Sequence, residues 1–263
     1  MTTRPHATRC PTFALVLLLV LPLACGGGGG TTDGPGAELF AGSADELIPH
    51  ETGRSARFRV TARHGGSSET SSFTATVTRN ASDGGFTTRY VSATGAIADS
   101  SSRDLGDAIE VVRFVNDPGG PREDVAEPDP PTVVVRTPVV AGDAIETGFE
   151  RTLELEIRVG SGSERRAILF TGRARRVPEE RGPVTVADGT YADAIRYAVE
   201  ASGDATIPIL GQSVALRVEV TGDEWFAIGV GGVKEELAVT VRVGDERTTV
   251  AFTTEREGAT PDA

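Results

Sequence analysis

The 263-residue sequence predicts an all-β protein, with antiparallel sheets of sequential hairpins arranged as a curved half-barrel or as two sheets. Apolar and polar residues alternate along several segments, as they do in strands that bury one face. Turn pairs rich in glycine separate these segments. No segment keeps a helical period over three turns, and only residues 44–47 are expected to form one short helical turn.

The alternating segments contain valine, leucine, isoleucine, phenylalanine and alanine at every second position, and they cover residues 57–63, 72–78, 152–159, 214–221 and 237–243. The expected turns between strands lie at Gly65-Gly66, Asp83-Gly84, Gly160-Ser161, Asp188-Gly189, Gly211-Gln212 and Gly244-Asp245. Each pair contains glycine, which supplies the positive φ angle that tight hairpin turns require. Consecutive strands are therefore expected to pair as hairpins.

The first 24 residues form an export signal. Arg4 and Arg9 precede an apolar run from Phe13 to Leu23, and Ala24-Cys25 follows. The run is shorter than the about 20 apolar residues that span a bilayer. The junction resembles the lipobox of bacterial lipoproteins, which implies cleavage before Cys25 and lipidation of its thiol and amino group. The resemblance implies anchoring to a membrane through Cys25.

The junction departs from the lipobox at one position. Pro22 stands three residues before the cysteine, where the family usually has leucine. The alternative is cleavage by ordinary signal peptidase, which would release a secreted protein with an unpaired exposed thiol. Gly26 after the cysteine is compatible with sorting to the outer membrane. Residues 25–37 are expected to be the lipidated cysteine and a flexible glycine-rich tether.

The composition excludes several classes of function. The formal net charge is −12, so an acidic surface would repel nucleic acid, and no nucleic-acid partner is expected. No cysteine follows Cys25, which excludes disulfides and cysteine-based metal sites from the folded part. No cofactor motif is present. His50 and His64 are expected to be exposed in loops.

The middle of the chain divides the folded part into two expected lobes, residues 38–116 and 132–255, followed by a disordered tail at 256–263. Residues 117–131 are rich in proline and acidic residues, and proline cannot donate to a sheet ladder, so a solvated loop is expected. A weak calcium site is the alternative interpretation, with Asp117, Glu123, Asp124 and Asp129 as ligands. No other metal site is expected.

Two motifs in the C-terminal half support a family resemblance. They are Gly189-Thr190-Tyr191 and the run from Trp225 through Phe226, Gly229 and Gly231 to Lys234. The chain resembles a family of uncharacterised bacterial envelope lipoproteins and periplasmic proteins, some of which are similar to lipoprotein-carrier half-barrels. Two Pro-x-x-x-Gly openings, at 49–53 and 138–142, also fit. The resemblance implies a curved antiparallel sheet and supplies no catalytic residues.

The motif residues allow two interpretations, structural or ligand-lining. Trp225 is expected to fill the core, or else to line a ligand site. Gly229 and Gly231 are expected to permit a bulge or corner, or else a close backbone approach to a ligand. The same two interpretations, a structural role or a place in the lining of a ligand site, apply to Gly189, Tyr191 and Phe226.

The expected function is a lipid-anchored cell-envelope protein with a non-enzymatic β domain. That domain would be structural, or would bind an apolar ligand or an envelope protein partner. Two alternatives remain open, a hydrolase of envelope polymers and an immunoglobulin-like adhesion module. Two close carboxylates in a cleft would favour the hydrolase, and two separate sandwiches would favour the adhesion module.

Overall fold

A computed structural model describes residues 36–81, 83–120, 123–159, 162–209 and 212–258. It confirms the all-β fold class, with antiparallel pairing between neighbouring strands throughout. The signal segment, Cys25, most of the tether and the turns at 160–161 and 210–211 lie outside the described residues, as do residues 259–263. No helix among the described residues has the length and apolar character needed to cross a membrane.

The strands of the N-terminal half are β1 (Glu38–Phe40), β2 (Ser55–His64), β3 (Ser67–Asn80), β4 (Gly85–Ser92), β5 (Ile97–Asp104), β6 (Ala108–Asn116) and β7 (Asp124–Ala126). The strands that follow are β8 (Thr132–Arg136), β9 (Val139–Val140), β10 (Ile145–Val159), β11 (Gly162–Val186), β12 (Gly189–Ile209), β13 (Gln212–Ala227), β14 (Gly231–Val243) and β15 (Glu246–Gly258). The short helix α2 (Ala44–Leu47) lies where one helical turn was expected.

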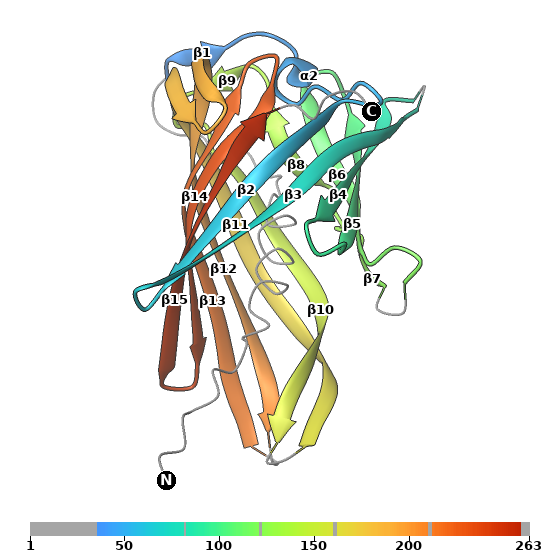
Figure 1. Cartoon of the computed structure of the whole chain (residues 1–263), viewed down its shortest axis with the longest axis vertical. Helices are drawn as coiled ribbons and strands as arrows, with labels where there is room; N and C mark the ends of the chain where they lie inside the picture. The colour runs from blue at the N-terminus through green and yellow to red at the C-terminus, as the bar shows by residue number, and fades with distance from the viewer. Residues whose placement is uncertain (1–35, 82, 121–122, 160–161, 210–211, 259–263) are drawn as a thin grey trace.

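One curved sheet of 13 strands contains almost all of these elements, in the order β10-β11-β12-β13-β14-β15-β2-β3-β4-β5-β6-β7, with β8 also paired to β6. Segments 38–116 and 132–255 therefore contribute to one sheet, and β15 pairs directly with β2. Figure 1 shows β2 and β3 crossing in front of the long strands β10–β13. A separate two-stranded sheet, β1 with β9, lies at one end.

The inner face of the long strands holds the main apolar core. It contains the residues that the alternation placed on one face of β2, β13 and β14, among them Val60, Val218, Val220 and Val239. Ile168, Phe170 and Val199 from β11 and β12 join them. Because successive side chains of a strand point to opposite faces, a two-residue period was enough to identify the buried side.

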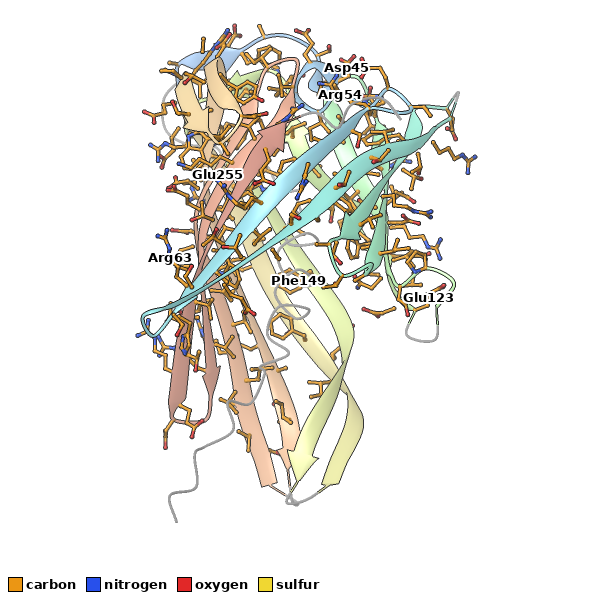
Figure 2. All side chains as sticks on the ribbon, in the orientation of Figure 1. Asp45, Arg54, Arg63, Glu123, Phe149 and Glu255 are labelled. Carbon is orange, nitrogen blue, oxygen red and sulfur yellow. The ribbon has the colours of Figure 1, made fainter. Side chains whose placement is uncertain are left out.

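The segment before β2 caps one end of the curved sheet. Leu47 of α2 is fully buried and packs in a second core cluster with Phe40, Phe86 and Tyr197. The amide of Gly229 donates to the carbonyl of Glu46 at 2.6 Å, which attaches α2 to the turn between β13 and β14. Figure 2 places Asp45 and Arg54 at this capped end, with Arg63 and Glu255 farther along β2 and β15.

Three expectations need correction. The loop at 117–131 contains β7, which pairs with β6 through Phe114 and Ala126, because the prolines leave residues 124–126 free to donate. The tail begins later than expected, since Arg256 to Gly258 still belong to β15 and Arg256 pairs with Phe58. His50 is half-buried, with its ring stacked 4.4 Å from that of Phe86.

Candidate functional site

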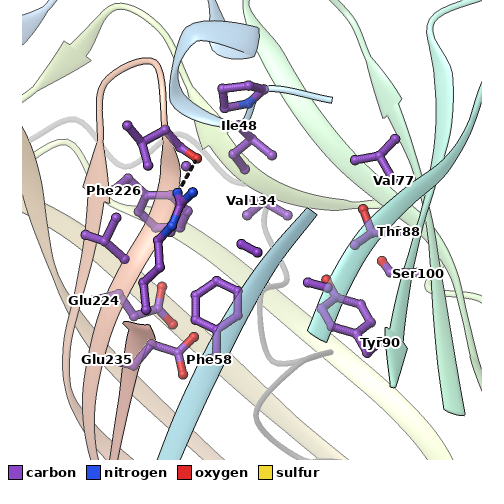
Figure 3. Close-up of a pocket in the computed structure, with 18 of the residues that line it drawn as sticks. Ile48, Phe58, Val77, Thr88, Tyr90, Ser100, Val134, Glu224, Phe226 and Glu235 are labelled. Atoms are coloured by element: carbon purple, nitrogen blue, oxygen red, sulfur yellow. Dashed lines mark hydrogen bonds between the residues drawn. The ribbon is translucent and has the colours of Figure 1, made fainter. Parts of the chain in front are cut away.

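A cavity of about 250 Å³ lies inside the curved sheet, next to the cap. Its wall combines aromatic, hydroxyl and charged side chains from ten strands of the sheet and from the segment before β2. Figure 3 shows Glu224, Glu235 and Phe58 on one side of the space, with Tyr90, Thr88 and Ser100 across from them. The residues come from segments nearly 180 positions apart, and the curvature of the sheet brings them together.

Two carboxylates lie side by side in this wall. Glu224 of β13 and Glu235 of β14 are direct cross-strand partners. Side chains in such positions have Cβ atoms about 4.5–5.5 Å apart. Both sit at inward positions, in line with Val220 and Leu237 of their strands. The pair interrupts an otherwise apolar inner face.

Glu224 forms a buried ion pair. It is 4% exposed, and its two oxygens lie 2.9 and 2.8 Å from Nη2 of Arg176 on β11. Arg176 also donates from Nη1 to the carbonyl of Val134 at 3.2 Å, across the interior to β8. The buried Arg176 side chain therefore connects β11 with both β13 and β8. Nε of Arg176 and the hydroxyl of Tyr197 are buried with no hydrogen-bond partner among the described residues.

Glu235 has a different environment. Burial, and then the nearby Glu224 carboxylate, raise its pKa to about 7, against the opposing effects of Arg176 and of a hydrogen bond from Thr254. Among the described residues, no basic side chain lies within ion-pair distance of Glu235. Burial, and then the Glu235 charge, also raise the pKa of Tyr90 to about 12. Tyr90 is therefore a neutral hydroxyl facing a carboxyl group that titrates near neutrality.

The aromatic side of the cavity is a row of three rings. Phe58 stacks on Phe73 with centroids 5.1 Å apart, and Phe73 meets Tyr90 at 6.1 Å with a tilt of 57°. Phe86 and Phe226 also line the space. The rings come from β2, β3, β4 and β13, which the sheet order places around the curve.

The predicted motif residues surround this cavity. Trp225, Phe226 and Gly231 are among the residues that line it, and Gly229 lies in the adjoining turn with φ 74°, where a side chain would be strained. Tyr191 donates to Asp188 at 2.8 Å, and Asp188 lies 3.4 Å from Nε of Arg256 in the cavity wall. Gly189 forms the β11–β12 turn with φ 145°.

Trp225 corrects the expectation of a fully buried core residue. It follows Glu224 directly, so its side chain points to the opposite face of β13. There it is half-buried and packs in a small cluster with Val184 and Val186. Nζ of Lys234 lies 4.9 Å from the centre of its ring. Lys234 in turn forms a 2.7 Å ion pair with Glu236.

His64 and the acidic residues of the expected calcium site are not among the residues that line the cavity. His64 is exposed at the end of β2, with Nδ1 3.0 Å from the carbonyl of Thr249. Among the described residues, no group of three or more histidine, cysteine or acidic side chains is placed to hold a metal ion. The calcium alternative, with Asp117, Glu123, Asp124 and Asp129, therefore finds no support in the described part of the chain.

Sequence reasoning missed Glu224, Glu235 and Arg176. A signal was present, because all three are charged residues at inward positions of an apolar alternation. Glu224 continues the two-residue period of Leu216, Val218 and Val220, and Glu235 begins the two-residue period that continues with Leu237 and Val239. A charge at such a position costs several kcal/mol unless it is paired or functional.

Comparison with known proteins yields two weak structural matches. One is a protein of Bacteroides fragilis that is provisionally described as exported and as having a YmcC-like fold. The match has 13% sequence identity, covers 86% of this chain and 100% of that chain, and has a TM-score of 0.33. The other is a provisionally described lipoprotein of Parabacteroides distasonis, at 13% identity over 84% and 99% of the two chains, with a TM-score of 0.37. No family model and no curated protein matches the chain. Similarity at this level assigns neither fold nor function.

Proposed function

We propose that the protein is a lipid-anchored cell-envelope protein whose β domain binds a small ligand in its interior cavity. The single observation that supports binding most directly is the cavity of about 250 Å³ with an acidic and an aromatic side. Ligand sites typically combine apolar walls with a few well-placed polar groups, in volumes of about 300–1,000 Å³. The space here is just below that range, so it suits a small molecule or one end of a larger one.

The anchor belongs to the same proposal. The signal and the Ala24-Cys25 junction support attachment to a membrane, and Gly26 supports the outer membrane. Several acyl chains hold a protein stably because each buried CH₂ contributes about 0.8 kcal/mol. Cys25→Ser should abolish incorporation of labelled palmitate and move the protein to the soluble fraction. Unchanged incorporation in this variant would refute the anchor.

The cavity test uses a filling substitution and a matched control. Ala75 lines the cavity from β3, so Ala75→Phe should occupy the space and abolish binding of any ligand that co-purifies. Thr74→Phe adds the same ring to the neighbouring position, whose side chain points to the other face, and should preserve binding. Native mass spectrometry of protein released from membranes reads out the bound mass. Equal occupancy in both variants would place the ligand elsewhere.

The hydrolase alternative has one observation in its favour, the adjacent pair of Glu224 and Glu235, in which Glu235 has the raised pKa expected of a general acid. Glu224 is held by Arg176 and is almost fully buried, so it is poorly placed to attack a substrate. Loss of an envelope-glycan-cleaving activity in Glu235→Gln would support the enzyme. The adhesion-module alternative lacks support, because the strands of both halves share one sheet.

A further inference from the structure

Glu235 is the one acidic side chain of the cavity wall without an ion-pair partner among the described residues. The three arginines of the same wall each have an acidic partner, although Nε of Arg176 and Nε of Arg256 have no hydrogen-bond partner among the described residues. Arg176 is paired with Glu224, and Arg256 lies 3.4 Å from Asp188 and donates to the carbonyl of Val230. Arg54 reaches the carbonyls of Gly229 and Val230 and lies 3.5 Å from Glu51. Among the charged side chains that line the described cavity, Glu235 is therefore the one without an ion-pair partner.

The aromatic row adds a second preference for positive charge. Phe58, Phe73 and Tyr90 line the same space as Glu235, and the raised pKa of Tyr90 has the Glu235 charge among its causes. The faces of aromatic rings carry partial negative charge and attract cations within about 6 Å of the ring centre. An ammonium group with an apolar body would meet both features, with the carboxylate accepting its N–H groups and the rings covering its carbon atoms.

We infer that the cavity binds a small organic ammonium compound, whose cation pairs with Glu235 and whose apolar part packs on Phe58, Phe73 and Tyr90. This inference rests on the proposed binding function and names the chemical class of its ligand. A free carboxylic acid or phosphate would face the Glu235 carboxylate, and each arginine that lines the described cavity already has an acidic partner. A long acyl chain would need more room than about 250 Å³ and would leave Glu235 buried beside hydrocarbon.

Binding of an ammonium compound should be linked to proton release. The titratable and charged groups that face Glu235 are Glu224 on β13, Arg176 on β11, Tyr90 on β4 and Arg256 on β15. Glu235 in the empty cavity titrates near pH 7, so a large fraction is protonated at pH 6. A bound cation favours the ionised form, so affinity should rise as pH increases from about 6 to 8, while Tyr90 stays protonated.

The test uses two probes of nearly equal shape, 2-phenylethylamine and the uncharged 2-phenylethanol. Each is titrated into the full-chain protein in a non-ionic detergent at pH 6 and pH 8, with heats measured by isothermal titration calorimetry. We expect the amine to bind at least about tenfold more tightly than the alcohol at pH 8, as a charge-assisted hydrogen bond would give. We also expect proton release, seen as a heat that depends on the ionisation enthalpy of the buffer.

Two variants assign the effect to Glu235. Glu235→Gln keeps the shape and removes the charge, and it should lose about ten- to a hundredfold in amine affinity together with the pH dependence. Glu236→Gln is the matched control, because Glu236 is exposed on the opposite face of β14 and pairs with Lys234. It should bind the amine as the original protein does. Thermal unfolding confirms that both variants are folded.

The outcomes separate this inference from the proposed function. Equal binding of amine and alcohol, both lost in Ala75→Phe, would overturn the ammonium preference and retain a ligand-binding cavity. Binding of neither probe at millimolar concentration would overturn the ammonium inference, and unchanged occupancy in Ala75→Phe would separately refute the cavity. Amine binding that survives Glu235→Gln would also overturn the inference.

Discussion

Arg176 Nη2 lies 2.8 Å from Glu224 Oε2, although β12 separates their strands in the sheet. Both side chains are nearly inaccessible, at 8% and 5% exposure. Tyr197 of the intervening strand is close enough for both charges to act on its hydroxyl, whose pKa is raised mainly by burial. The ion pair thus lines the cavity and links β11 to β13 across β12.

Removing one partner of this pair should be costly. Arg176→Met leaves the Glu224 carboxylate buried without its cation, and we expect a loss of about 3–5 kcal/mol in the free energy of unfolding. The double variant Arg176→Met with Glu224→Leu removes both charges and should recover most of that loss. Urea denaturation of the two single variants and the double variant measures the coupling. Additive losses would show that the pair contributes no interaction.

The titration of Glu235 predicts a pH-dependent stability. The pKa of Glu235 is about 7 in the folded protein and about 4.3 in an unfolded chain. At a pH between these two pKa values, the folded state therefore keeps a proton on Glu235 that the unfolded state has lost. Stability from this group therefore falls as pH rises from about 4.5 to 7 and is constant above. Glu235→Gln should stabilise the protein by about 1–3 kcal/mol at pH 8 and by little at pH 4.5.

Thermal unfolding at the two pH values checks this prediction. Glu236→Gln again serves as the control, because its side chain is exposed on the other face. An equal shift of the melting temperature at both pH values in Glu235→Gln would contradict the assigned titration.

Trp225, the one tryptophan of the chain, reports on the cluster with Val184 and Val186. Since it is half-buried beneath Lys234, Trp225→Ala should cost less than the about 3–5 kcal/mol of a fully buried tryptophan. Its fluorescence should be partly accessible to iodide. Strongly blue-shifted emission that iodide cannot quench would instead indicate the fully buried position first expected from the sequence.

Gly203 allows a close contact between strands and rings in the main core. An added Cβ at Gly203 would overlap the ring of Phe170, so Gly203→Ala should destabilise the protein by about 1–3 kcal/mol. Gly182→Ala on β11 is the matched control, because a Cβ there meets nothing within 4 Å and should leave stability nearly unchanged. Chemical denaturation compares the two. A larger loss in Gly182→Ala would refute the packing argument.

The strands and their buried faces could be predicted because alternation is a local property. Val218, Val220 and Val239 are buried as the two-residue period indicated. The length of β11 could not be predicted, since Pro178 and the charged residues after it interrupt the pattern. The structure accommodates them with a register shift between Pro178 and Glu180.

The cavity could not be predicted for a different reason. Glu224 and Glu235 are close in sequence, and their inward positions could have been noticed. Phe58, Tyr90 and Arg176 reach them only because the sheet curves and because β15 pairs with β2. Curvature and the pairing of distant strands are not encoded in any short window of the chain.

The pairing of β15 with β2 also has a consequence for how the protein is made. The first long strand and the last one are neighbours in the interior of the sheet, while both edges come from the middle of the chain. A growing chain therefore cannot complete this sheet until β15 has been made. Loss of only the last strand would divide the sheet into two open halves, so a stop codon near residue 245 should yield an aggregation-prone product although more than nine-tenths of the chain is intact.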